Sequence, residues 1–156
     1  MDDNSDRPGL FAPPPLIYLV ALVLGIVAQM IQPWILPVPT VFRWGLGGAL
    51  ALAAIVLGIT ARNTFARAGT NVNPYQPATC LVTEGPFRFS RNPMYLGMTM
   101  LFAGGILMLR NGWLLILLPL LMILMHVAVV LREERYLGKK FGEEYAAYCS
   151  RVRRYF

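Results

Sequence analysis

Four long apolar stretches dominate the chain, and short polar segments separate them. The stretches cover residues 16–32, 41–61, 94–109 and 112–131. A helix needs about 20 apolar residues to cross a bilayer, so the second and fourth are long enough, and the first and third are at the short end. The pattern predicts an all-α integral membrane bundle of four transmembrane helices.

Proline and polar residues mark the breaks between these stretches. Three prolines around Trp34 end the first predicted helix, and the tripeptide Arg110-Asn111-Gly112 joins the last two helices as a hairpin. Residues 1–15 are acidic and rich in proline, with neither a basic n-region nor a small-residue cleavage site before the apolar run. We therefore expect a short disordered lead-in and not a cleaved signal peptide.

Two polar segments remain, and both carry candidate functional residues. Residues 62–93 contain several Asn, Gly and Pro residues, which predicts a loop applied closely to the helix ends. Residues 133–148 predict an amphipathic helix, because apolar residues recur there at steps of three and four. Its apolar stripe, which would lie on the membrane surface or pack on the bundle, comprises Tyr136, Leu137, Phe141, Tyr145 and Tyr148.

The basic residues are distributed unevenly along the chain. If both termini and the 62–93 loop share one side, only Arg43 and Arg110 of the 14 Lys and Arg residues lie on the other side. This asymmetry is the positive-inside bias of membrane proteins, so we expect the termini and the active site to be cytoplasmic. We expect the bacterial inner membrane as the location.

Composition narrows the class of protein further. The chain has 156 residues, 56% of them hydrophobic and 14% charged, which predicts a single membrane domain over residues 1–156. The net charge of +6 favours anionic lipid headgroups over nucleic acid, because the basic residues flank apolar runs. Cys80 and Cys149 have no metal-ligand spacing, and His126 is the single histidine, so no metal site is expected.

The first candidate for chemistry is the charged run Arg132-Glu133-Glu134-Arg135 after the fourth apolar stretch. Ionisable residues at the end of a membrane helix are costly, and they are usually paired or functional. The run is either an interfacial cluster that stops the helix or a carboxylate pair that faces a sulfonium or ammonium centre.

The second candidate is the segment that leads into the third predicted helix. Asn92 can cap this helix, and Pro93 suits its first turn. The same helix start exposes backbone N–H groups, which can bind a carboxylate or a ribose hydroxyl. These residues alone leave both interpretations open.

Together these motifs resemble a known family. They are Leu81-Val82-Thr83-Glu84-Gly85-Pro86-Phe87, Arg91-Asn92-Pro93-Met94-Tyr95, Glu133-Glu134, Phe141-Gly142-Glu143-Glu144-Tyr145 and Arg151-Val152. In this order and spacing the chain resembles the isoprenylcysteine carboxyl methyltransferase (ICMT) family and its phospholipid methyltransferase relatives. The resemblance covers about residues 71–152.

The resemblance implies an S-adenosylmethionine cofactor, with S-adenosylhomocysteine as product, and a lipophilic acceptor that enters from the bilayer. The implied cofactor-binding residues are Val72, Asn73, Thr79, Cys80, Leu81, Val82, Phe87, Arg91, Asn92, Pro93, Met94, Tyr95 and Glu133. For the catalytic residues we predict Arg132 as the acceptor contact, and Glu134 as a residue that neutralises Arg132 or binds an amine acceptor.

Two departures from the family pattern affect the substrate. Asn92 stands at the family's histidine position, so that position holds no catalytic base. Val129 stands where the prenylcysteine enzymes have an arginine. The first predicted acceptor is an isoprenylcysteine-type carboxylate, and the alternative is a phospholipid or other lipid amine. A membrane reductase of the sterol-reductase type and a non-catalytic membrane protein are two further alternatives.

Overall fold

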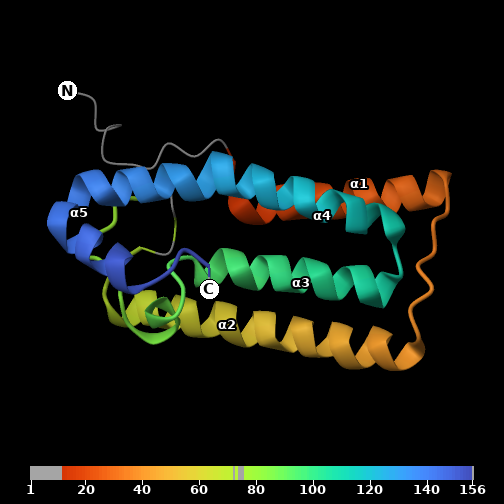
Figure 1. Ribbon diagram of the computed structural model, residues 1–156. Coiled ribbons are helices and arrows are strands. Elements are labelled where there is room, and N and C mark those ends of the chain that lie inside the picture. The colour runs from red at the N-terminus through yellow and green to blue at the C-terminus, as the bar shows by residue number, and fades with distance from the viewer. Residues whose placement is uncertain (1–11, 72, 74–75, 156) are drawn as a thin grey trace.

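The computed structural model describes residues 12–71, 73 and 76–155, and its long helices run side by side (Figure 1). In chain order they are α1 (Pro14–Ile31), α2 (Gly47–Arg67), α3 (Pro93–Leu109), α4 (Gly112–Met125) and α5 (Leu131–Arg151). A π-helical turn, η2 (Phe42–Leu46), precedes α2; a second, η4 (His126–Val130), joins α4 to α5; and a short 3-10 helix, η3 (Gly85–Arg88), precedes α3.

The helices have the lengths and compositions of membrane helices. Three helical runs are long and apolar enough to cross a bilayer, namely Pro14–Ile31, Phe42–Arg67 and Gly112–Arg151. The remaining apolar helix, Pro93–Leu109, has 17 residues and is shorter. Large apolar side chains stay exposed on the outside of the bundle, as with Leu24 (55%) and Ile123 (63%), which is expected for surfaces that contact lipid. The prediction of an all-α membrane bundle is confirmed.

Small residues allow α2 and α3 to pack closely. Ala54 and Ala61 of α2 are almost fully buried. A Cβ atom placed on Gly104 of α3 would lie 2.8 Å from the backbone oxygen of Gly47. No side chain larger than hydrogen fits there, which is the usual arrangement where membrane helices approach each other most closely.

A second contact joins α1, α3 and α4 around an apolar core. Tyr18 of α1 and Phe102 of α3 pack edge to face, with ring centroids 6.1 Å apart. Leu114 and Leu121 of α4 complete this core with 0% and 3% exposure. The core therefore lies between the helices, while their outer faces remain available to lipid.

The predicted hairpin between the last two membrane helices is present. Arg110 adopts the left-handed conformation (φ 54°) that ends α3. The side-chain oxygen of Asn111 accepts hydrogen bonds from the backbone N–H groups of Trp113 and Leu114, which caps α4.

Several predicted boundaries are wrong. Residues 62–67 belong to α2 and not to the loop, because charged residues such as Arg62 and Arg67 end the apolar pattern but not the helix. Pro14 and Pro15 form the first turn of α1, which suits proline, and are not part of a disordered lead-in. The remainder of that lead-in, residues 1–11, lies outside the described residues.

The charged run after the fourth apolar stretch does not close a helix. α4, η4 and α5 form one continuous helical run, and Arg132 to Arg135 lie inside it. The predicted amphipathic helix 133–148 is part of α5, and Gly142 divides it with non-helical angles (φ 50°, ψ −119°). Glycine adopts such angles readily. The chain therefore turns back at Gly142 toward the start of α3 (Figure 1).

Candidate functional site

A cavity of about 250 Å³ lies at one end of the bundle, where the 68–92 connection, the start of α3 and α5 meet. We call this end, including residues 152–155, the site end. The cavity is lined by Pro14, Pro15, Phe65, Asn71, Asn73, Gln76, Ala78, Cys80, Leu81, Val82, Phe87, Arg91, Asn92, Pro93, Met94, Tyr95, Met98, Glu133, Glu134, Tyr136, Leu137, Tyr145 and Tyr148. Mostly apolar walls with a few convergent polar groups are typical of small-molecule sites.

Asn92 and Pro93 begin α3 at the wall of this cavity. Asn92 occupies the N-cap position and Pro93 the first helical position, as the sequence predicts. The Asn92 side chain makes no capping hydrogen bond; its Nδ2 instead donates to the backbone oxygen of Arg154 at 3.1 Å. The backbone N–H of Asn92 donates to Ser90 Oγ. The side chain therefore joins the start of α3 to a distant segment.

Glu133 is held against the start of α3. The hydroxyl group of Tyr95 donates a 2.6 Å hydrogen bond to Glu133 Oε2, and both residues line the cavity. Glu133 is the third residue after the η4 turn, and π-helical turns within α-helices are frequent at functional sites. The hydrogen bond fixes a carboxylate at the cavity wall, where it can bind a cationic or hydroxyl group.

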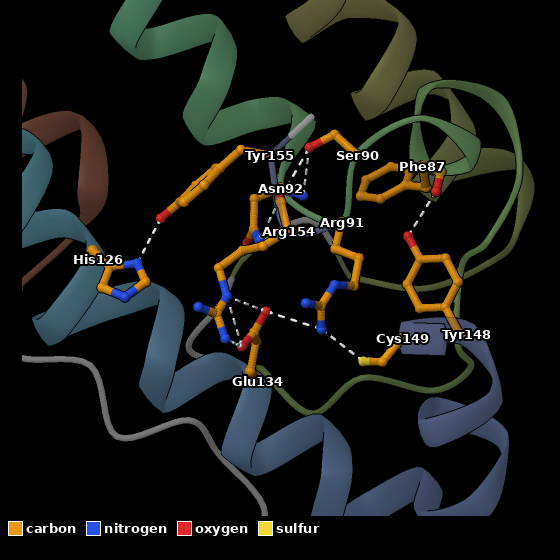
Figure 2. A network of polar contacts seen from close by, with 10 residues as sticks. All are labelled: Phe87, Ser90, Arg91, Asn92, His126, Glu134, Tyr148, Cys149, Arg154 and Tyr155. Atoms are coloured by element: carbon orange, nitrogen blue, oxygen red, sulfur yellow. Dashed lines mark hydrogen bonds and ion pairs between the residues drawn. The ribbon is translucent and has the colours of Figure 1, made fainter. Parts of the chain in front are cut away.

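Glu134 is paired with two arginines (Figure 2). Its Oε1 lies 3.1 Å from Arg91 Nη1, and its Oε2 lies 2.7 Å from Arg154 Nη2. Arg154 Nε also donates to both carboxylate oxygens, which gives a bidentate pair. The charge of Glu134 is therefore already balanced within the protein.

Arg91 is the one cation among the described lining residues. Besides contacting Glu134, its Nη1 donates to Cys149 Sγ at 2.6 Å. Its Nε is buried and has no hydrogen-bond partner among the described residues. An unpaired buried donor is costly, so a ligand that accepts from this nitrogen would be favoured.

The aromatic stripe of α5 holds the connecting loop. Tyr136 accepts a hydrogen bond at its hydroxyl oxygen from the backbone N–H of Ala78, and Tyr148 donates one of 2.7 Å to the carbonyl of Phe87. Tyr145 and Tyr148 pack with Val152 in a small apolar core of their own. Of the two arrangements predicted for the stripe, the structure has the one that packs on the protein.

Most of the predicted site residues come together around this cavity. Those that line it are Asn73, Cys80, Leu81, Val82, Phe87, Arg91, Asn92, Pro93, Met94, Tyr95, Glu133 and Glu134. Thr79 does not line the cavity, and its hydroxyl group donates to the carbonyl of Gly69. Arg132 is exposed and also lies outside the lining. Val72 lies outside the described residues.

Several site residues carried no usable signal in the sequence. Phe65, Met98 and the prolines of α1 reach the cavity through folding of the bundle, and their sequence pattern is that of ordinary apolar filler. In the sequence, Arg154 is one of several basic residues near the C-terminus, and no motif distinguishes it from them. His126 lies outside the lining, and its Nδ1 is 2.8 Å from the hydroxyl of Tyr155. Within the described chain no group of three His, Cys, Asp or Glu residues is placed to hold a metal.

A family model described as phospholipid methyltransferase matches residues 42–144, about two thirds of the chain. The chain belongs to this family. Comparison with curated proteins and with solved structures gave no match. The matched stretch contains α2, α3, α4 and most of α5, and with them nearly all of the cavity wall. The protein is therefore an integral membrane methyltransferase. Membership of this family does not support the reductase or the non-catalytic alternative.

Proposed function

We propose that the cavity binds S-adenosylmethionine and that the protein transfers its methyl group to a lipophilic acceptor that enters from the bilayer. The observation that carries the proposal is the carboxylate of Glu133, which Tyr95 fixes at the wall of a largely apolar cavity. A carboxylate there can bind the ammonium or ribose hydroxyl groups of the cofactor. The apolar lining, with Leu81, Val82 and Phe87, suits the adenosyl moiety.

The cofactor supplies an activated methyl group on a sulfonium sulfur. The chain would contribute mainly alignment in a site shielded from water, since transfer to an acceptor that has no proton to lose, such as a carboxylate or a neutral amine, needs little acid–base help. Glu133 would orient the polar end of the cofactor, and Asn92 and Tyr95 would fix the start of α3 around it. Glu134 would not contact either substrate as a free charge, because Arg91 and Arg154 already neutralise it.

A lipid amine is the acceptor that the charges of the cavity favour. A carboxylate acceptor would need a positive charge to balance its own, and the charge of Arg91, the one cation among the described lining residues, is already balanced by Glu134. The exposed position of Arg132 supports no contact with an acceptor inside the cavity. An amine needs no such partner.

An isoprenylcysteine-type carboxylate is the second candidate, and a different observation favours it. No histidine is among the described lining residues, and Asn92 cannot act as a base. A carboxylate accepts a methyl group without prior loss of a proton, whereas an ammonium group must first be deprotonated. O-methylation would therefore proceed without a base.

A direct assay separates the two acceptors. Purified protein in vesicles is given methyl-labelled S-adenosylmethionine and either phosphatidylethanolamine or a farnesylcysteine analogue. We expect label in the lipid amine, at a rate that increases with pH as the neutral amine becomes more abundant. Label in farnesylcysteine alone would reverse the order of the candidates. Label in neither, together with no cofactor binding, would contradict the proposed function.

We also propose that the site end faces the cytoplasm. This rests on the charge asymmetry: among the basic residues that the structure describes, only Arg43 and Arg110 belong to the opposite end. Cysteines introduced at exposed Arg88 and exposed Val41 test it with a membrane-impermeant thiol reagent. In intact cells labelling is expected at position 41 and not at position 88; the reverse result would invert the orientation.

A further inference from the structure

Residues 152–155 lie beyond the family match, yet they contact the centre of the site (Figure 2). We call them the clasp. The carbonyl of Arg153 accepts a 3.0 Å hydrogen bond from the backbone N–H of Arg91. The carbonyl of Arg154 accepts from Ser90 Oγ and from Asn92 Nδ2, both at 3.1 Å. Neighbouring carbonyls of the clasp therefore bind the segment that begins α3.

The Arg154 side chain joins the clasp to α5. Its guanidinium group makes the bidentate pair with Glu134, whose side chain is only 13% exposed, while that of Arg154 is 36% exposed. The hydrogen bonds with Glu134 raise the pKa of Arg154 above its already high ordinary value, so the group stays charged. Val152 and Tyr155 secure the ends of the clasp, through an apolar core and through His126.

Arg154 is not a lining residue of the cavity. Its carbonyl holds Asn92, its guanidinium holds Glu134, and Glu134 in turn holds Arg91. One residue thus connects two polar segments that line the cavity, residues 91–92 and Glu134. Bidentate charge-assisted bonds fix geometry as well as adding energy, which suits a residue that orients others.

We propose that the clasp sets the geometry of the methyltransferase site, with Arg154 as a positioning residue that holds Asn92 and Glu134 from outside the cavity. The part of this inference that concerns cofactor affinity rests on the proposed function. The part that concerns the position of residues 90–92 does not. Preorganisation of a ligand site by supporting residues normally shows as affinity, because the free protein no longer has to be ordered on binding.

The test compares full-length protein in detergent with the variants Arg154→Gln, Arg154→Lys and Arg153→Gln. Arg153→Gln is the matched control, because it removes the same charge from an exposed side chain one residue away. Amide hydrogen exchange of a peptide covering residues 90–95 measures how firmly the start of α3 is held, and titration with S-adenosylhomocysteine measures affinity. Asn111→Ala serves as a second control, since it lowers stability at the other end of the bundle.

For Arg154→Gln we expect roughly tenfold weaker binding and faster exchange at Arg91 and Asn92, since a charge-assisted pair is lost. Arg154→Lys should recover part of both effects, and Arg153→Gln and Asn111→Ala should leave both near the parent values. If Arg154→Gln does not fold, Arg154→Lys alone must show the graded change. Exchange and affinity equal to those of the parent in both Arg154 variants would overturn the clasp. If Arg154→Gln exchanges faster than the parent but the parent itself binds no S-adenosylhomocysteine, the clasp is supported and the cofactor proposal is contradicted.

Discussion

The two ends of the bundle use polar residues in different ways. At the far end, formed by the α1–α2 connection and the α3–α4 turn, Arg43 and Arg110 each donate to a backbone carbonyl. Asn111 donates to the carbonyl of Gly25 and caps α4. At the site end, partly buried charges pair with each other beside a cavity of about 250 Å³.

This difference separates a structural role from a functional one. Polar side chains at the far end bind backbone groups of the neighbouring helices and connections. Glu133 and Glu134 instead place two carboxylates, from consecutive residues, in partly buried positions, where the partial loss of water opposes their charge. Stability alone would not favour that arrangement, so the site end is the part of the molecule in which ligand binding has to be sought.

Removal of Glu134 should have the largest effect on stability. Glu134→Ala leaves two arginines without their shared partner, and we expect a loss of about 3 kcal/mol in the free energy of unfolding, together with loss of activity. Thermal unfolding in detergent measures the change. Glu144→Ala removes an exposed carboxylate from the same helix and should change little. Equal effects of the two variants would show that the charge cluster is only a solvated surface feature.

Asn111→Ala should destabilise the far end of the bundle, as Glu134→Ala destabilises the site end. The variant loses a helix cap and the hydrogen bond to Gly25 from a side chain that is 2% exposed, which we expect to cost about 2 kcal/mol. Measured on the folded fraction, its affinity for S-adenosylhomocysteine should equal that of the parent. A large loss of affinity in this variant would contradict the separation of the two ends.

Glu133→Gln should separate binding from folding at the site end. The amide keeps the shape of the side chain and its hydrogen bond with Tyr95 but removes the charge, so we expect roughly tenfold weaker S-adenosylhomocysteine binding with little change in melting temperature. Glu143→Gln, at an exposed position, is the matched control. Undiminished binding by Glu133→Gln would remove Glu133 from the cofactor site.

Tyr95→Phe should have the smallest effect of the series. It removes the hydroxyl group that donates to Glu133 and leaves the ring in place. We expect the binding free energy of S-adenosylhomocysteine to weaken by about 1 kcal/mol, which is a decrease of roughly fivefold in affinity. Titration with S-adenosylhomocysteine checks it, and combination with Glu133→Gln should give less than the sum of the two effects. Additive losses would mean that the two residues act independently.

Much of this fold follows from local features of the sequence. The apolar stretches and the hairpin at Asn111 could be predicted because hydropathy and capping are local properties. The end of α2 at Arg67 could not be predicted in this way. A helix can continue beyond its apolar stretch, because charged residues such as arginine also have a high helix propensity. The turn at Gly142 could not be predicted either, because a single glycine within a helical pattern is compatible with both a continuous helix and a turn.

The residues of the candidate site also differ in whether local sequence patterns predict them. Glu133, Asn92 and Tyr95 belong to compact motifs, so a resemblance to a family was enough to select them. Arg154 pairs with Glu134 across 20 residues of sequence and a reversal of the chain, and no local pattern predicts that contact. Arg132, which the sequence favoured for its charge, lies on the exposed side of the same helix.

Calorimetry with S-adenosylhomocysteine tests most directly whether the site end binds S-adenosylmethionine. Full-length protein in detergent is titrated up to millimolar ligand, with Asn111→Ala as a control for stability and Glu133→Gln as a control for the site. The account predicts saturable binding of one ligand per chain, equally strong in Asn111→Ala and weaker in Glu133→Gln. Absence of binding by the folded parent protein at millimolar ligand would contradict it.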